Sequence, residues 1–241
     1  MLWLLYRTHL DTTLTIMQAN EQQSIQLASQ TVDAVFGVLH GDALYLAENS
    51  SLQQWLNTGD PVIRSHLNAD FLAFTRSRRL YDQVRFLDQH GQELVRINWN
   101  DGKPEVIAEE QLQSKLDSYY VRKTLALNEQ AVFMSPFDLN IEHDVIEQPI
   151  KPTIHLSTPV FDSKGQKRGL IVLNYRGQRL LNRLRAIADK KSGDLWFLNK
   201  EGYWILGPHP DMEWGFMYPD RQTMRFGHEY GEDTWLSMLK G

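Results

Sequence analysis

The feature that most constrains this chain is a proline-free stretch from Thr8 to about Glu48 in which apolar residues recur every three or four positions. This spacing predicts a single helix of roughly 40 residues, about 60 Å long at a rise of 1.5 Å per residue. Helices of globular proteins average about 11–12 residues, so one of this length is typical of a coiled coil, a membrane span or a rod. The apolar stripe consists of Leu10, Leu14, Met17, Ile25, Ala28, Val32, Val35, Leu39 and Leu46.

Two features of this region leave alternatives open. Gly37 and Gly41 are four residues apart inside the helix, which predicts close contact with another helix or a bend at Gly41. The first six residues, MLWLLY, are apolar and are followed by Arg7, whereas a membrane span needs about 20 apolar residues. They form either an apolar helix start or the end of a transmembrane helix whose beginning lies outside this sequence.

The composition excludes several classes of protein. The chain is 42% hydrophobic and 23% charged, an ordinary balance for a globular protein and not that of a disordered one. Its net charge of −5, without any basic stripe, argues against binding to nucleic acid. Because cysteine is absent, disulfide scaffolds and cysteine-ligated metals are excluded.

The search for catalytic motifs gives no candidate. The sequence has no glycine-rich nucleotide-binding motif and no Gly-x-Ser-x-Gly elbow, so an enzyme is not supported. The group most like a metal site is Glu142-His143-Asp144, and its polar neighbours predict a solvated turn instead. Neither a metal nor a cofactor is therefore expected.

The pattern after the long helix predicts a second helix. In Asn57–Pro61, Asp60 is suited to the N-cap position and Pro61 to the first helical position. The helix then ends in the basic residues Arg76, Arg78 and Arg79, which are expected to be a solvated helix C-terminus, since cations are favourable there.

One short pattern, which predicts a β-hairpin, occurs three times. Each copy has an apolar strand, an Asp or Asn, two polar residues, a Gly and another apolar strand. The Asp or Asn side chain opens the turn by bonding to the backbone, and the Gly supplies a positive φ angle. The three copies are Arg85–Gly91, Val160–Gly165 and Phe197–Gly202.

The remaining segments complete an alternation of strands and helices. A helix at 117–127, a strand at 131–134, a long loop to about Pro152 and a strand at 153–161 are expected between the first two hairpins. An amphipathic helix at 179–190 precedes the third. The sequence thus predicts a five-stranded antiparallel module and the start of a second one, and we expect the chain to stop inside that second domain because strands to close its sheet are missing.

Several motifs together resemble one known family. They are Ser135–Asn140 (SPFDLN), Pro149–Pro152 (PIKP), Ser157–Asp162 (STPVFD), Gly169–Val172 (GLIV), Glu213–Met217 (EWGFM) and Phe226–Trp235. The combination resembles the double Cache family, the tandem PAS-like extracytoplasmic sensor domains of bacterial membrane receptors. The last two motifs are similar to the membrane-proximal module of that family.

This resemblance implies a fold and a domain division. The expected fold is α+β, with a long N-terminal helix followed by two PAS-like (Cache) modules with antiparallel sheets, the second incomplete at its C-terminus. Residues 1–60 would form the stalk helix, 61–176 the membrane-distal, ligand-binding module, and 177–241 the connecting helix and membrane-proximal module.

The resemblance also implies a function. The chain would be the periplasmic ligand-sensing domain of an inner-membrane receptor, anchored by flanking helices absent from this sequence and working as a homodimer without nucleic acid. It would not itself be an enzyme, and a histidine kinase of a two-component system, a diguanylate cyclase or a chemotaxis module would follow it. The alternative is an intracellular PAS-type module for interaction or cofactor binding.

The ligand, a carboxylate, amino acid or amine-like molecule, is expected on the sheet face of the first module, under the loop from Ser135 to Pro152. Arg96 ranks first, as a bidentate donor to a carboxylate. Strand alternation places it opposite to Val95 and Ile97, and Trp99 then points the other way. The other expected site residues, partly from the amino-acid-binding signature of the family at a different spacing, are Trp99, Tyr119, Tyr120, Ser135, Phe137, Asp138 and His155. The alternative is that Arg96 pairs internally with Asp138 and nothing binds.

Overall fold

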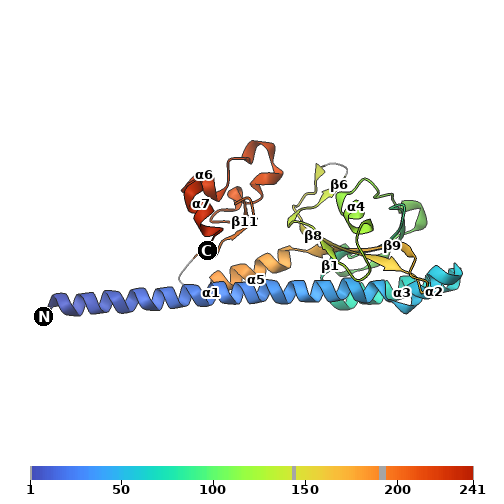
Figure 1. Cartoon of the computed structure of the whole chain (residues 1–241), viewed down its shortest axis with the longest axis horizontal. Helices are drawn as coiled ribbons and strands as arrows, with labels where there is room; N and C mark the ends of the chain where they lie inside the picture. The colour runs from blue at the N-terminus through green and yellow to red at the C-terminus, as the bar shows by residue number, and fades with distance from the viewer. Residues whose placement is uncertain (1, 143–144, 190–193, 241) are drawn as a thin grey trace. The chain divides into compact units, whose positions relative to one another are not determined.

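The computed structural model describes residues 2–142, 145–189 and 194–240, which form two units. The sheet unit consists of Phe36–Pro136 and Glu147–Gly177, and the C-terminal unit consists of Met1–Val35, Phe137–Ile146 and Gln178–Gly241. Figure 1 traces the chain from its first helix, in blue, to the end of the C-terminal unit, in red.

The long helix is confirmed, since α1 runs without interruption from Leu2 to Ala47 over 46 residues. From Val35 onward the predicted stripe is buried, with Leu39 and Leu46 at most 1% exposed, whereas Leu14, Met17 and Ile25 are exposed. The helix continues through both glycines. A Cβ atom at either would meet no atom within 4 Å, so the expected contact with another helix is not made within the described part of this chain.

The expected stalk at residues 1–60 contains a second helix as well. α2 (Ser50–Thr58) begins after Asn49, whose side chain accepts a hydrogen bond from the Leu52 N–H, and ends at Gly59 in the left-handed conformation. This cap interrupts the helical pattern, because Asn49 supplies an acceptor to a new helix start.

The caps of α3 (Pro61–Arg78) are those expected from the sequence. Asp60 accepts a hydrogen bond from the Val62 N–H, Pro61 is the first helical residue, and Arg79 ends the helix with φ 56°. The basic terminus is exposed as predicted, at Arg76, Arg78 and Arg79, and Arg78 in addition forms an ion pair of 2.7 Å with the buried Asp42 of α1. This pairing explains how the Asp42 carboxylate can be buried, because a charged side chain is rarely buried without an ion-pair partner.

The sheet unit contains an antiparallel sheet with the strand order β3-β2-β1-β9-β8-β4. Figure 1 shows α3 and α4 (Tyr119–Leu125) on opposite sides of this sheet. The strands are β1 (Tyr81–Asp88), β2 (Glu93–Asn98), β3 (Glu105–Val106), β4 (Phe133–Met134), β8 (Pro152–Phe161) and β9 (Lys167–Arg176). The sheet therefore has β3 in addition to the five expected strands, because two residues are too few to show an alternating pattern.

All three hairpin turns have the predicted mechanism. The side chain of Asp88 accepts hydrogen bonds from the N–H groups of His90 and Gln92, at 2.8 and 2.9 Å, and Gly91 has φ 75°. Asp162 with Gly165 (φ 72°), and Asn199 with Gly202 (φ 83°), repeat this arrangement. The Asp or Asn side chain thus fixes each turn.

The segment expected as a long loop before Pro152 contains short strands. They are β5 (Asp138–Leu139), β6 (Ile141–Glu142) and β7 (Val145–Ile146), and β6 pairs with β7. Strands of two residues leave no periodic signal in a sequence. Short 3-10 helices occupy Asn100–Gly102, Glu109–Gln111, Pro210–Met212, Gly215–Met217 and Pro219–Arg221.

The last segment of the C-terminal unit, Gln178–Gly241, begins with the amphipathic helix α5 (Gln178–Ala188). The predicted apolar residues of α5 are all buried. A hairpin of β10 (Phe197–Leu198) and β11 (Trp204–Leu206) follows. The region after it, for which no helix was predicted, holds two short helices, α6 (Phe226–Tyr230) and α7 (Glu232–Met238). They bring Phe226 and Trp235 against Trp204, so aromatic packing orders a segment without helical periodicity.

Candidate ligand-binding site

A β-bulge gathers charged residues on one face of the sheet. In the β1–β2 pair, Arg85 lies opposite Arg96, and Leu87 lies opposite Glu93. The register shifts between Phe86 and Leu87, so β2 has one residue in excess there. A bulge reverses the alternation of side chains beyond it. Glu93 therefore shares a face with Arg85 and Arg96, although its sequence position alone would place it on the other face.

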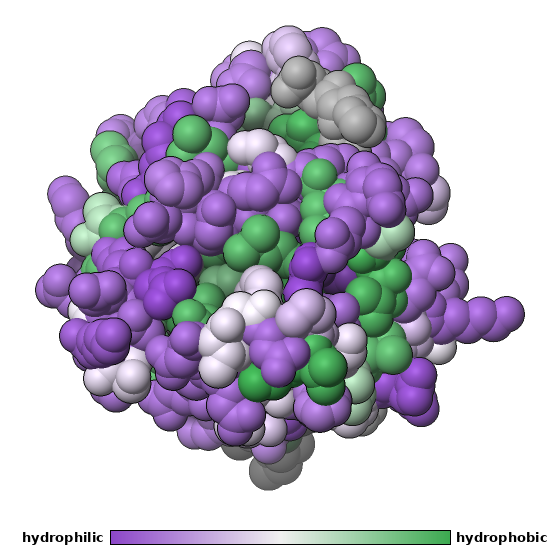
Figure 2. All heavy atoms as spheres, turned by 90° about the vertical axis from the view of Figure 1, so that its right-hand side faces the viewer, coloured by the Kyte–Doolittle hydropathy of each residue, from purple (hydrophilic) through white to green (hydrophobic). Residues whose placement is uncertain are grey.

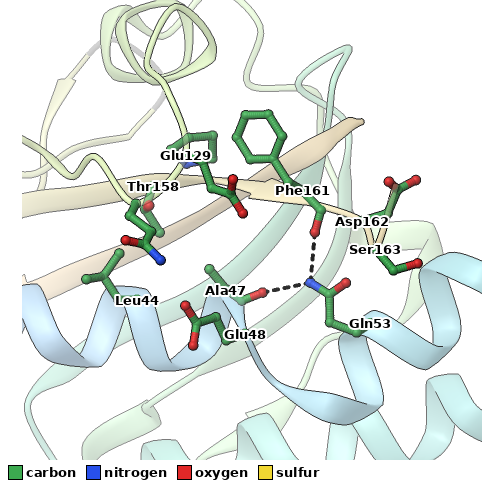
Figure 3. Close-up of a pocket in the computed structure, with 11 residues that line it drawn as sticks. Leu44, Ala47, Glu48, Gln53, Glu129, Thr158, Phe161, Asp162 and Ser163 are labelled. Carbon is green, nitrogen blue, oxygen red and sulfur yellow. Dashed lines mark hydrogen bonds between the residues drawn. The ribbon is translucent and has the colours of Figure 1, made fainter. Parts of the chain in front are cut away.

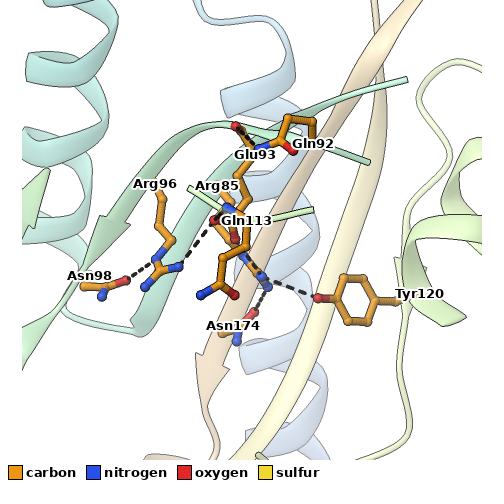
Figure 4. Close-up of polar contacts among 8 residues, drawn as sticks. All are labelled: Arg85, Gln92, Glu93, Arg96, Asn98, Gln113, Tyr120 and Asn174. Carbon is orange, nitrogen blue, oxygen red and sulfur yellow. Dashed lines mark hydrogen bonds and ion pairs between the residues drawn. The ribbon is translucent and has the colours of Figure 1, made fainter. Parts of the chain in front are cut away.

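These residues form a buried network with Asn174 of β9 (Figure 4). The two oxygens of the Glu93 carboxylate lie 3.4 Å from Arg85 Nη1 and 3.3 Å from Arg96 Nη1. Arg85 Nη2 donates to Asn174 Oδ1 at 2.6 Å. Arg85 and Glu93 are only 2% and 1% exposed, a degree of burial that charged residues reach only when they are paired.

Helix α4 places Tyr120 over the same face. Arg85 Nη1 donates to the Tyr120 hydroxyl at 3.4 Å, and the guanidinium lies 5.7 Å from the centroid of that ring. The His155 ring, from β8, stacks on Tyr120 with centroids 4.6 Å apart. We call Arg85, Glu93, Arg96, Tyr120, His155 and Asn174 the Arg85 cluster. Beside it, Tyr120 also packs with Leu87, Val121, Leu170 and Val172.

Two nitrogen atoms of the Arg85 cluster are buried without a hydrogen-bond partner, Arg85 Nε and His155 Nδ1. Leaving a buried donor or acceptor unsatisfied costs about 1–3 kcal/mol, so native proteins satisfy nearly all such groups with protein, water or ligand. The cluster thus has capacity for a further hydrogen-bonding group.

The environment sets the charges of the cluster. Burial, together with the positive charges of Arg85 and Lys115, lowers the pKa of His155 to about 3, so this ring is neutral at physiological pH. Burial would lower the pKa of Arg85, but Tyr120 and Glu93 outweigh it and raise that pKa. Burial would likewise raise the pKa of Tyr120, but Arg85 outweighs it and the pKa is lowered. The cluster is therefore a cationic site beside an apolar wall.

The structure brings three of the residues expected at the site together, namely Arg96, Tyr120 and His155. Ser135 lies next to them, where its Oγ accepts a hydrogen bond of 2.9 Å from the His155 N–H. Tyr119 is 41% exposed and touches Tyr120 edge-on. Ser135 and Tyr119 therefore contact residues of the cluster without belonging to it.

The other expected residues lie elsewhere. Trp99 follows the end of β2, and the guanidinium of Arg176 lies over its ring, 5.4 Å from the ring centroid. Phe137 and Asp138 belong to the C-terminal unit, where Phe137 packs edge-on against Trp214. The internal ion pair considered for Arg96 does occur, but with Glu93 as the partner.

Arg85, Glu93 and Asn174 were not predicted as site residues. Arg85 carries the same signal as Arg96, a cation within an apolar strand, but it stands in a hairpin motif that by itself predicts only a turn. Glu93 precedes the strand that was expected, and its orientation depends on a bulge that no pattern in the sequence announces.

Two hollows of the sheet unit lie outside the Arg85 cluster. One, of about 280 Å³, lies at the end of α1, where Gln53 Nε2 donates to the carbonyls of Ala47 and Phe161, both at 3.0 Å (Figure 3). The other, of about 520 Å³, is lined by Trp55 and by Arg64, which pairs with Glu109 and with a backbone carbonyl. In both, hydrogen bonds within the chain already use polar groups of the lining.

The end of the molecule that carries α2 and α3 is hydrophilic. Figure 2 shows this end covered mostly by hydrophilic residues, with hydrophobic ones in separate small groups. Among the described residues no group of three or more His, Asp and Glu side chains could hold a metal ion. His143 and Asp144, expected in a solvated turn, lie outside the described residues.

Several solved structures have a similar fold. The extracellular domain of vpHK1S-Z8, a protein described as a histidine kinase, has a TM-score of 0.77 at 18% identity, covering 97% of this chain and 81% of that one. A domain of a sensory box/GGDEF family protein from Vibrio parahaemolyticus has a TM-score of 0.71 at 19% identity, covering 95% and 83%. The ligand-binding domain of the Campylobacter jejuni chemoreceptor Tlp3, in complex with 4-methylisoleucine, has a TM-score of 0.60 at 14% identity, covering 82% and 73%.

These similarities confirm the fold that the double Cache resemblance implied. The sensing role is confirmed by the sensor-domain family model that matches most of the chain. In the described residues, the helices are all too short or too polar to cross a membrane. No curated protein matches the sequence. A family model described as "Bacterial histidine kinase, sensor domain" matches residues 18–241. The chain therefore belongs to the bacterial histidine kinase sensor domain family.

Proposed function

We propose that this sensor domain binds a small molecule at the Arg85 cluster and that a histidine kinase is the output of its receptor. The observation that carries the binding site is the buried Arg85 Nε–H, which has no partner in a cationic cluster. Sensor domains must recognise a ligand with few, well-placed polar groups, and the Arg85 cluster supplies such groups beside an apolar wall.

The strands that carry the cluster also lead to the helices that would transmit the signal. β9 carries Asn174 and ends at Arg176, and α5 begins only two residues later, at Gln178. β1 carries Arg85 and begins at Tyr81, whose hydroxyl donates to Asp42 of α1 at 2.7 Å. A change in the spacing of β1 and β9 on binding would therefore reach both helices directly.

The ligand is proposed to be small and to carry a carboxylate. Tlp3 structures with 4-methylisoleucine and with L-valine support this size and this group. Guanidinium groups are well suited to carboxylates because they offer several N–H donors in one plane.

A thermal-shift screen of carboxylates, amino acids and amines tests the site. A ligand at a hundredfold excess over Kd should stabilise the wild type by about 2.7 kcal/mol. Arg85→Gln and Arg96→Gln should reduce that shift, whereas Arg122→Gln, which removes an exposed charge from α4, should leave it unchanged. A ligand whose shift survives both cluster variants would place the site elsewhere.

We also propose that two copies associate through α1. The part of α1 from Leu14 to Leu27 exposes several large apolar residues, Leu14, Ile16, Met17, Ile25 and Leu27. Glu21 interrupts the stripe, so the isolated domain should pair only weakly, since a tight coiled coil needs sustained heptads. Sedimentation at increasing concentration should show this pairing. A strictly monomeric domain, with no change on adding membrane helices at both ends, would contradict it.

A further inference from the structure

The two nitrogen atoms of the Arg85 cluster without a partner belong to residues that contact α4. The guanidinium of Arg85 donates to the hydroxyl of Tyr120, and the ring of His155 stacks on that of Tyr120 (Figure 4). Arg85 and Asn174 are at most 4% exposed. A molecule that reaches either nitrogen therefore has Tyr120 as an immediate neighbour, and the position of α4 decides how much room it finds.

The helix α4 depends on contacts with the sheet for its position. It has only 7 residues, and isolated helices shorter than about 12–15 residues are marginal in water. Tyr120 and Val121 pack against apolar residues of β1 and β9, and the hydroxyl of Thr124 bonds to that of Ser157. These side-chain contacts leave the carbonyl groups at the C-terminal end of the helix to be satisfied separately.

Lys167, the first residue of β9, supplies that contact. Its Nζ donates to the carbonyl oxygens of Leu125 and Leu127, at 2.5 and 2.8 Å, and lies 5.4 Å from the centroid of the Phe161 ring. A cation is favourable at this end of a helix, where the last carbonyls have no helical partner. One strand, β9, therefore holds the end of α4 through Lys167 and also carries Asn174 of the cluster.

We infer that Lys167 is a positioning residue of the sensing site, which holds α4 over the Arg85 cluster and so limits how often the cluster opens to a ligand. This inference rests on the proposed function, because it concerns access to the site proposed there. Lys167 acts through α4 and the Tyr120 ring that this helix carries.

The absence of cysteine from this chain lets a single introduced thiol report on α4. Val172 is fully buried on the sheet face under α4, and Val84 is fully buried on the face toward α3. A buried thiol reacts with a maleimide only while the segment that covers it is open. The labelling rate of Val172→Cys therefore measures opening of α4, and that of Val84→Cys measures opening of the other face.

Removing the ammonium group of Lys167 should change only the first of these rates. In Lys167→Met, Val172→Cys should label about tenfold faster, equivalent to about 1.4 kcal/mol, while Val84→Cys should label at an unchanged rate. Lys167→Arg keeps a cation with several donors, so it should restore nearly the original rate at Val172→Cys. Lys123→Met removes an exposed cation from the last turn of α4 and should leave the rate unchanged.

Three results would overturn the inference. Equal acceleration at Val172→Cys and Val84→Cys would show that Lys167 serves only the stability of the whole unit. An unchanged rate at Val172→Cys would show that Lys167 does not hold α4, and the same acceleration in Lys123→Met would assign the effect to charge alone. Should Val172→Cys not fold, hydrogen exchange of the cysteine-free protein decides, because the amides of α4 should exchange about tenfold faster in Lys167→Met and those of β1 should not.

These measurements need no ligand, so they separate the inference from the proposed function. If α4 does not open in Lys167→Met, but the thermal-shift screen finds a ligand whose binding is lost in Arg85→Gln, the inference alone is wrong. If α4 opens as expected and no compound of the screen binds the wild type, the proposed function is wrong.

Discussion

The two faces of the central sheet are buried equally well but by different chemistry. On the face toward α3, Val84, Phe86 and Ile97 are fully buried. On the face toward α4, the same strands bury Arg85 and Glu93 almost as completely. Buried ion pairs are often no more stabilising than well-packed apolar residues of similar size, so the second face gains little stability from its charges. The comparison agrees with the proposal that one face holds the fold together while the other binds the ligand.

The largest expected effect is on the apolar face. Phe71 of α3 is fully buried, and replacing a buried Phe by Ala typically costs about 3–5 kcal/mol through lost burial and the cavity left behind. We expect Phe71→Ala to lower the free energy of unfolding by about this amount, measured by urea denaturation. Val62→Ala, at an exposed position of the same helix, is the control and should change stability by less than about 0.5 kcal/mol. A loss below 1 kcal/mol for Phe71→Ala would show that this face is not the main core.

The charged face should respond to single and double changes in different ways. Glu93→Leu leaves Arg85 and Arg96 without their carboxylate, which should cost about 3 kcal/mol. Adding Arg85→Met removes the fully buried guanidinium, so the double variant should regain most of that loss in urea denaturation. It should nevertheless bind no ligand. A double variant as unstable as Glu93→Leu alone would mean that the charges of this face serve the fold.

The pH dependence of stability gives a third way to distinguish the two faces of the sheet. The folded-state pKa of His155, about 3, is below the ordinary value near 6.5, so protonation favours the unfolded chain. The contribution of His155 is therefore fully present above pH 6.5 and is lost as the pH falls from 6.5 toward 3. At pH 5 the loss should be about 2 kcal/mol relative to pH 7.5.

Comparing urea denaturation at these two pH values checks this expectation. His155→Phe should remove that part of the fall, whereas His66→Gln, at an exposed position of α3, should keep it. An unchanged fall in His155→Phe would show that the ring already accepts a proton in the folded state.

The sequence predicted those parts of the fold whose signal lies within a few neighbouring residues. The helix α1 repeats its pattern for many turns, and the loops opened by Asp88, Asp162 and Asn199 contain their own hydrogen-bond acceptors and glycines. β3 and the helices α6 and α7 were missed because they are short, and packing from distant residues decides their conformation.

The candidate site was predictable only in part. A cation between Val95 and Ile97 pointed to Arg96, and the amino-acid-binding signature of the double Cache family pointed to Tyr120. The bulge that turns Glu93 toward these residues depends on the pairing of β1 with β2, which is a property of two strands together. Sequence reasoning that considers one strand at a time therefore finds the arginine but not its partner.

The smallest effect compares two threonines that occupy the same local position on opposite faces. Thr75 of α3 and Thr124 of α4 are both fully buried, and each donates its hydroxyl to the carbonyl four residues earlier. Thr124 differs in one respect, because its hydroxyl also bonds to that of Ser157, which is itself fully buried.

Thr75→Val replaces one hydroxyl by a methyl group and should change stability by less than about 0.5 kcal/mol. Thr124→Val also leaves Ser157 without this partner, so it should cost about 1 kcal/mol more in urea denaturation. The double change Thr124→Val with Ser157→Ala should recover that difference, since removing both partners of a buried hydrogen bond is nearly neutral. Equal losses of stability for the two single variants would mean that the face toward α4 tolerates an unpaired hydroxyl, as a hydrated face would. That result would weaken the proposal that the polar groups of this face form a binding site that excludes water.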